Sequence, residues 1–254
     1  MNITREQFKK LALNSALHKT DVMCMAVDNL ELLLSQPDES VGLIYCDILY
    51  GTGRNFGDFQ DLKPIRSEIE AHYLPRLKEM HRVLKSTGSI YLHMDWRISH
   101  WVRCIMDDIF GHKNFRNEII WKYGLGGSGN REFAKKHDNI LFYTKSNEYT
   151  FNLQYEPATS NMMKGKMKKM TDVWDVPTLN NMAKERVGYD TQKPKELIER
   201  IIKASSNEGD TVADYYLGSG TTAVVCKELS RNFIGCDINP KAIEITKARL
   251  DALS

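Results

Sequence analysis

The 254-residue sequence lacks several features that would assign it to a class at once. It has only five cysteines and no CxxC pair, so neither a disulfide framework nor a metal centre is expected; Cys46 and Cys236 lie in apolar runs typical of a core. No apolar run approaches the roughly 20 residues that span a bilayer, and the N-terminal residues carry scattered charges instead of an apolar leader. We therefore expect a reducing, cytoplasmic location and no membrane contact.

An excess of one charge sign is also absent. The chain has 35 Lys and Arg against 33 Asp and Glu, a formal net charge of +2, and its mean hydropathy is −0.44. This balance excludes a histone-like polycation and permits nucleic-acid binding only where positive charge gathers on one face. The composition predicts one large domain with an ordinary core and leaves the function open.

A short apolar stretch followed by a helical pattern recurs along the chain, without a fixed-period repeat. This alternation predicts an α/β, doubly wound domain with a seven-stranded, mostly parallel sheet. Strands are expected at 22–26, 41–46, 89–94, 117–122, 139–144, 211–213 and 232–236, and helices at 4–17, 28–35, 67–85, 97–110, 194–205, 220–230 and 240–252. Residues 147–190 have no clear period and are interpreted as an insertion at one end of the sheet.

A glycine-rich turn at Gly218-Ser219-Gly220 follows a strand that ends at Asp214, and a helix is expected to begin near Thr221. Glycines allow close backbone approach, a helix N-terminus offers free N–H groups, and an acid such as Asp237 after the next strand can accept ribose hydroxyls. The pattern indicates a nucleoside-bearing cofactor, the alternative being a plain strand-to-helix turn.

The identity of that cofactor depends on two neighbouring positions. A dinucleotide fingerprint needs a third glycine where this chain has Ala223. A carboxylate at Asp214 would repel a pyrophosphate and suits a cationic ammonium, as in S-adenosyl-L-methionine (AdoMet). An NAD-dependent oxidoreductase is therefore the disfavoured alternative.

A second motif lies at the end of the apolar strand 41–46, where Asp47 is followed three residues later by Tyr50. Ligands of doubly wound sheets bind beyond the carboxyl ends of the strands, so Asp47 and Gly218 are expected to share one rim.

The tetrapeptide Asp47-Ile48-Leu49-Tyr50 resembles the (Asp/Ser/Asn)-Pro-Pro-(Tyr/Phe/Trp) motif of the amino-methylating DNA methyltransferases of the β arrangement, with both prolines replaced. Residues 214–220 resemble the family's cofactor motif Asp-x-Phe-x-Gly-x-Gly, with Tyr216 in place of Phe, and 191–206 and 25–33 resemble two further family segments. The likeness covers about 20–145 and 190–252.

The resemblance implies AdoMet as the cofactor and an antiparallel strand near one sheet edge. It implies a catalytic part at 1–146, a target-recognition insertion at 147–190 and an AdoMet-binding part at 191–254. The catalytic residues would be Asp47, Ile48, Leu49 and Tyr50, and Asp28 would face the cofactor's adenine. The cofactor-binding residues would be Asp28, Lys193, Asp214, Tyr216, Gly218, Ser219, Gly220, Thr221 and Asp237.

The resemblance further implies methylation of adenine N6 in double-stranded DNA after base flipping, with Tyr50 stacking on the base and Asp47 accepting from its amino group. Aspartate instead of serine at position 47 favours adenine over cytosine N4. Two alternatives stay open: a cytosine-N4 methyltransferase, and a homologue that binds AdoMet and DNA but lost catalysis with its prolines.

DNA contacts are expected from basic residues near the sheet rim and in the insertion, although a solvated basic face is the alternative. These are Arg131, Lys135, Lys164, Lys166, Lys168 and Lys169. Trp174 could stack on bases, whereas Trp121 is more typical of a core. Because the insertion is short for reading several base pairs, we expect a short recognition site or a homodimer; a cognate restriction endonuclease is a further partner in question.

Overall fold

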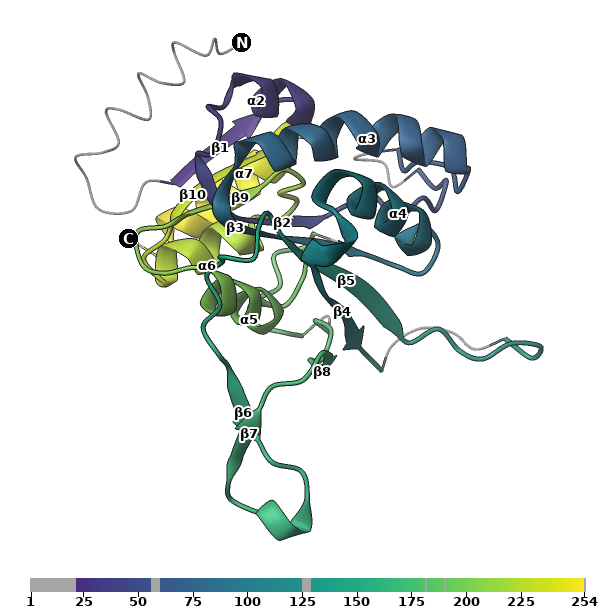
Figure 1. Cartoon of the computed structure of the whole chain (residues 1–254), viewed down its shortest axis with the longest axis vertical. Helices are drawn as coiled ribbons and strands as arrows, with labels where there is room; N and C mark the ends of the chain where they lie inside the picture. Colours follow the sequence, from purple (N-terminus) through teal and green to yellow (C-terminus); the bar gives the residue numbers. More distant parts are fainter. Residues whose placement is uncertain (1–21, 56–59, 125–128, 181, 190, 254) are drawn as a thin grey trace.

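The computed structural model describes residues 22–55, 60–124, 129–180, 182–189 and 191–253, so the helix expected at 4–17 lies outside it. Its main sheet has eight strands in the order β1-β10-β9-β2-β3-β5-β4-β8 (Figure 1). The strands are β1 (Val22–Ala26), β2 (Val41–Asp47), β3 (Leu84–Met94), β4 (Phe115–Lys122), β5 (His137–Thr144), β8 (Val173–Asp175), β9 (Thr211–Asp214) and β10 (Asn232–Asp237).

Every strand of this sheet runs parallel to the others except β5, which is antiparallel to both β3 and β4. The antiparallel strand near one edge is therefore confirmed. The expected number of seven strands is wrong by one, because a three-residue strand from the insertion, β8, pairs with the free edge of β4.

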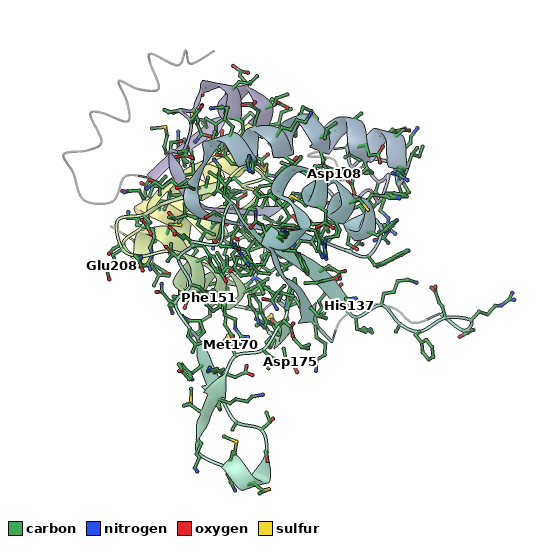
Figure 2. All side chains as sticks on the ribbon, in the orientation of Figure 1. Asp108, His137, Phe151, Met170, Asp175 and Glu208 are labelled. Carbon is green, nitrogen blue, oxygen red and sulfur yellow. The ribbon has the colours of Figure 1, made fainter. Side chains whose placement is uncertain are left out.

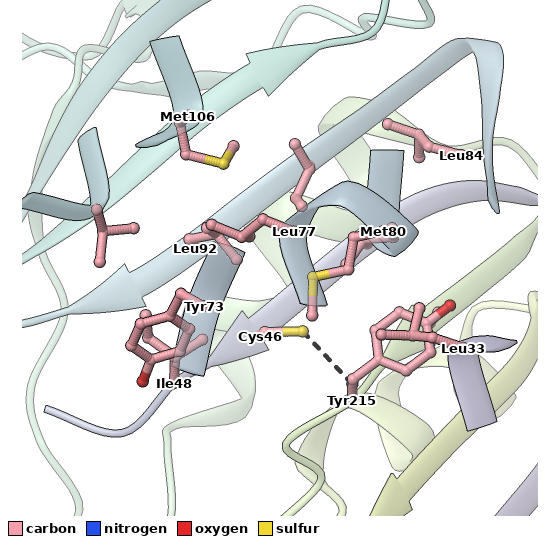
Figure 3. Packing of buried hydrophobic residues seen from close by; sticks show 14 of the residues in the cluster. Leu33, Cys46, Ile48, Tyr73, Leu77, Met80, Leu84, Leu92, Met106 and Tyr215 are labelled. Carbon is pink, nitrogen blue, oxygen red and sulfur yellow. Dashed lines mark hydrogen bonds between the residues drawn. The ribbon is translucent and has the colours of Figure 1, made fainter. Parts of the chain in front are cut away.

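Within the described residues, six α-helices cover the two faces of the sheet. One face carries α2 (Asn29–Ser35), α3 (Arg66–Val83) and α4 (Ser99–Phe110), and the other carries α5 (Lys195–Ser205), α6 (Thr221–Glu228) and α7 (Pro240–Asp251). Because β2 is buried on both sides, its residues are almost continuously apolar: Ile44 and Cys46 belong to the first core and Leu43 and Tyr45 to the second. Figure 3 shows the first core, where the Cys46 thiol meets the Tyr215 backbone.

The insertion forms a projecting arm made of β6 (Tyr155–Pro157) and β7 (Met167–Lys169), which pair with each other and with no other strand that the structure describes. Figure 2 shows Met170 at the base of this arm, with few side chains around the arm itself. Trp174 on β8 is buried in the second core beside Trp121, so its interpretation as a base-stacking residue is wrong. None of the helices in the described ranges could cross a bilayer.

The order of the strands reverses between β9 and β2, and this point positions the site. From β9 the chain crosses through α6 to β10 on one side, whereas from β2 it crosses through α3 to β3 on the other. The helices therefore diverge and leave a crevice at the carboxyl ends of both strands. Asp214 ends β9 and Asp47 ends β2, so residues far apart in sequence meet at this crevice.

Candidate active site

A cavity of about 640 Å³ opens at this crevice and brings the predicted residues together. All four residues of the tetrapeptide line it, as do eight of the nine predicted cofactor residues. Those eight are Asp28, Lys193, Asp214, Tyr216, Gly218, Ser219, Thr221 and Asp237. The shared rim expected for Asp47 and Gly218 is therefore confirmed, whereas the individual roles stay predictions.

Gly220 is the ninth predicted residue and has a different task. It precedes α6 with a φ of +75°, and a Cβ at this position would lie 2.2 Å from Oγ1 of Thr246 on α7. Glycine is required here by both the left-handed backbone and the close approach of α7. Gly220 therefore shapes the turn without lining the cavity.

Asp214 is buried at the floor of the cavity. Its carboxylate accepts from Oγ1 of Thr222 at 2.6 Å and from the Tyr216 amide at 3.0 Å. Burial raises the pKa of Asp214 from 3.8 to about 7, and the charges of Asp47 and Asp237 add to the increase, while the two hydrogen bonds oppose it. A cationic ligand would relieve this crowding of negative charge.

Two other carboxylates hold the loops around the cavity. Asp237 accepts from the amides of Gly218 and Asn239, both at 2.9 Å, which ties the glycine turn to the end of β10. Asp28 caps α2 by accepting from the Leu30 amide at 2.8 Å, and it forms an ion pair with Arg76 at 3.0 Å. The predicted adenine-facing residue is thus already bonded to two donors.

The backbone of the tetrapeptide is fixed without prolines. The Ile48 amide donates to the His93 carbonyl at 3.0 Å, and the Tyr73 hydroxyl donates to the Leu49 carbonyl at 2.8 Å. None of the hydrogen bonds found in the described part of the chain uses the Ile48 carbonyl. This carbonyl remains available beside the Asp47 carboxylate.

Both oxygens of Asp47 accept hydrogen bonds. Oδ1 lies 2.9 Å from the Tyr50 hydroxyl, and Oδ2 lies 2.5 Å from Nζ of Lys193. The Lys193 ammonium also lies 5.3 Å from the centroid of the Tyr50 ring. Lys193 is predicted to bind the cofactor, and no motif in the sequence indicates that it also reaches the tetrapeptide.

A buried pair behind Tyr50 was largely missed by sequence reasoning. Nε2 of the fully buried His93 on β3 lies 3.1 Å from Oδ2 of Asp138, the second residue of β5. The Tyr50 hydroxyl is 3.0 Å from the same carboxylate oxygen. The available signal was the position of Asp138 directly before the apolar run 139–144, and the antiparallel direction of β5 is what places it at the rim.

The predicted DNA contacts divide into exposed and paired side chains. Lys164, Lys166, Lys169 and Arg131 are exposed. Lys168 forms an ion pair with Glu156 at 3.1 Å, because β6 and β7 place the two opposite each other, and Lys135 bonds to Glu132 at 2.6 Å. Neither paired lysine offers an uncompensated charge.

The chain matches the family model described as DNA methylase over residues 41–248. The type II methyltransferase M.HpaI of Haemophilus parainfluenzae is 36% identical over 235 residues, covering 89% of this chain and 71% of that protein. The DNA adenine methyltransferase YhdJ of Escherichia coli is 31% identical over 245 residues, and the match covers 89% of this chain and 82% of YhdJ.

Solved structures share the fold at low sequence identity. The cytosine-N4-specific PvuII DNA methyltransferase has a TM-score of 0.68 at 16% identity, covering 91% of this chain and 86% of its own. The complex of M1.HpyAVI with SAM has a TM-score of 0.63 at 19% identity, and the match covers 91% of this chain and 99% of the M1.HpyAVI chain.

Proposed function

The chain belongs to the DNA methylase family, and from this premise we propose that it transfers the methyl group of AdoMet to N6 of adenine in double-stranded DNA. The observation that carries the proposal is the single cavity lined by both Asp47-Tyr50 and the Asp214–Gly218 turn. A methyl acceptor held at Asp47-Tyr50 and a methyl donor held at the Asp214–Gly218 turn would meet inside this cavity.

The chemistry of the cavity suits AdoMet, which supplies an electrophilic methyl carbon on a positively charged sulfonium. Asp214 and Asp237 give the cavity a negative character that a cationic ligand would neutralise. Gly218 allows close approach of the ligand to the backbone, and Asp214 would hold the ammonium of the methionine part.

On the acceptor side, the target base must leave the stack, because its amino group is inaccessible inside the duplex. Tyr50 would stack on the flipped ring, a contact worth roughly 1–3 kcal/mol. The Asp47 carboxylate and the Ile48 carbonyl would accept the two N–H groups of the amine. Asp47 would then offset the positive charge that develops on nitrogen as it attacks the methyl carbon.

Adenine is favoured over cytosine by the aspartate at position 47 and by the similarity to a relative named as an adenine methyltransferase. Cytosine N4 is the second candidate, since a cytosine-N4-specific enzyme has the same fold. Mass analysis of nucleosides from methylated DNA distinguishes N6-methyladenine from N4-methylcytosine.

The inactive-homologue alternative depends on Ile48 and Leu49, and the hydrogen bonds of this corner argue against it. The prolines of the family motif would restrict the backbone, and here the bonds to His93 and Tyr73 do so. We expect an active wild type, and we expect Ile48→Pro to lower turnover because it removes the amide that donates to His93. A rise in turnover on Ile48→Pro with Leu49→Pro would favour the inactive-homologue reading.

The decisive experiment is expression in a methylation-free host followed by modification-aware sequencing of the host DNA, which reports activity, base and motif together. Asp47→Asn should lower the rate at least 10²-fold, within the range of a positioned acid–base group. Asp108→Asn makes the same chemical change at an exposed site on α4 and should leave the rate unchanged. Methylation by Asp47→Asn at the wild-type rate would reject the proposed mechanism. The homodimer and the cognate restriction endonuclease stay predictions.

A further inference from the structure

A chain of buried polar side chains lies behind the tetrapeptide, on the side away from the glycine turn. The Tyr50 hydroxyl lies between two carboxylates, 2.9 Å from Oδ1 of Asp47 and 3.0 Å from Oδ2 of Asp138. Asp138 also accepts from Nε2 of His93 at 3.1 Å and from the Tyr123 hydroxyl at 2.9 Å. Asp138 is only 5% exposed, so these contacts replace its water shell.

The direction of β5 explains how Asp138 reaches this place. The parallel strands present their last residues at the rim, whereas β5 runs the opposite way and presents its first residues there. In the register of the sheet, His93 lies beside Asp47 on β2 and beside Ile140 on β5. The antiparallel strand therefore delivers a third carboxylate next to a corner built by parallel strands.

His93 is one of the groups that keep this carboxylate ionised. A carboxylate at Nε2 selects the imidazole tautomer with a proton on Nε2, which leaves Nδ1 to accept from the Tyr45 hydroxyl at 2.9 Å. Burial raises the pKa of Asp138, but the hydrogen bonds from His93 and Tyr123 and the charge of Lys193 together outweigh burial, and the pKa lies below its usual value. Asp138 is thus an anion that can accept a hydrogen bond from the Tyr50 hydroxyl.

We propose that Asp138, held by His93, is a positioning residue that draws the Tyr50 hydroxyl proton away from Asp47 and fixes the Tyr50 ring. The inference rests on the proposed function. One hydroxyl has one proton, so the two carboxylates compete for it. While the Tyr50 hydroxyl donates its hydrogen bond to Asp138, Oδ1 of Asp47 keeps a lone pair for the incoming amine. The same hydrogen bond keeps the Tyr50 ring in the orientation in which it receives a base.

The same competition predicts what happens without the negative charge. In Asp138→Asn the amide has a weaker acceptor oxygen, and the Tyr50 proton moves to Asp47. Oδ1 of Asp47 is then occupied by the Tyr50 hydroxyl when the target amine arrives. It stabilises the positive charge on the amine less, so the transition state is stabilised less. We expect kcat to fall roughly 10- to 100-fold, the range for losing one hydrogen bond to a charged group. The KM for AdoMet should stay within about twofold, because Asp138 is absent from the cofactor cavity lining.

A double-mutant cycle tests the route of the effect. If Asp138 acts through the Tyr50 hydroxyl, then Asp138→Asn should change kcat less than about twofold in the Tyr50→Phe background. Tyr123→Phe removes the other tyrosine contact of Asp138 and leaves the contact to Tyr50, so it serves as the matched control and should stay within about threefold of wild type. Circular dichroism and the free energy of unfolding of all variants show whether they fold.

Two results would overturn the inference. The first is a fall in kcat on Asp138→Asn that is the same in the wild-type and Tyr50→Phe backgrounds. Asp138 would then have a structural role only. The second is the absence of coupling between Tyr50 and Asp138 when the same cycle is measured on the free energy of unfolding. A wild-type chain that methylates no DNA would instead reject the proposed function and the inference together, whereas an active wild type with multiplying losses rejects the inference alone.

Discussion

Replacing Asp214 by asparagine should stabilise the ligand-free protein while weakening the binding of AdoMet. The carboxyl is 2% exposed, and its pKa is raised from 3.8 to about 7, chiefly by burial. Asparagine has nearly the same shape, and its amide can accept from the Tyr216 amide and donate to the Thr222 hydroxyl. The variant would therefore keep both contacts without burying a negative charge.

The magnitude follows from the shift in pKa. A carboxyl whose pKa is higher in the folded than in the unfolded state favours folding at low pH and loses this contribution as the pH rises toward the folded value. Relative to a neutral group, the raised pKa of Asp214 lowers the stability of the folded state by about 2 kcal/mol at pH 5, where only the unfolded state ionises, and by about 4 kcal/mol at pH 8, where both states do. The advantage of Asp214→Asn should grow by about 2–3 kcal/mol between these pH values.

Urea unfolding of wild type and Asp214→Asn at pH 5 and pH 8 measures this difference, with Asp108→Asn as the exposed control that should show no such trend. Calorimetric titration with AdoMet at pH 8 should show at least about a tenfold weaker Kd for Asp214→Asn, because the ammonium loses its charged partner. A stability difference that is independent of pH, or one that favours the wild type at pH 8, would refute the reasoning about the buried charge.

Two further outcomes follow from the glycine turn and the arm. Gly220→Ala should lower Tm strongly, by several degrees more than Gly111→Ala, because both glycines have a positive φ but only a Cβ at 220 would clash with Thr246; equal losses in thermal unfolding would contradict this. Lys164→Ala with Lys166→Ala should weaken DNA binding and reduce the slope of log K against log salt by about 2, measured by fluorescence anisotropy; an unchanged slope would remove the arm from the DNA interface.

The sequence predicts the main sheet well because its strands are buried on both faces and therefore read as apolar runs. It could not predict β6, β7 or β8, since a three-residue strand is too short to show an alternating pattern. The same limit hides the pairing of one of the predicted DNA-contacting lysines. Residues 157–171 contain no acid, yet the pairing of β6 with β7 places Glu156 opposite Lys168.

The site shows a similar division. Asp47 and Asp214 were predictable because both end apolar strands, and the reversal of strand order brings such ends together. The position of Asp138 depends on the direction of β5, which no local pattern encodes. The contact of Lys193 with Asp47 depends on the path of the chain before α5, where the sequence has no strand or helix to set its geometry.

The lysine at the tetrapeptide has a consequence for selectivity. Because Lys193 holds Oδ2 of Asp47 at 2.5 Å, an arriving amino group finds one acceptor oxygen of this carboxylate already occupied. Under the proposed mechanism, water or a small amine could not stack on Tyr50, whereas a base flipped out of DNA could. The ion pair would in this way favour a stacking base over small nucleophiles as the methyl acceptor.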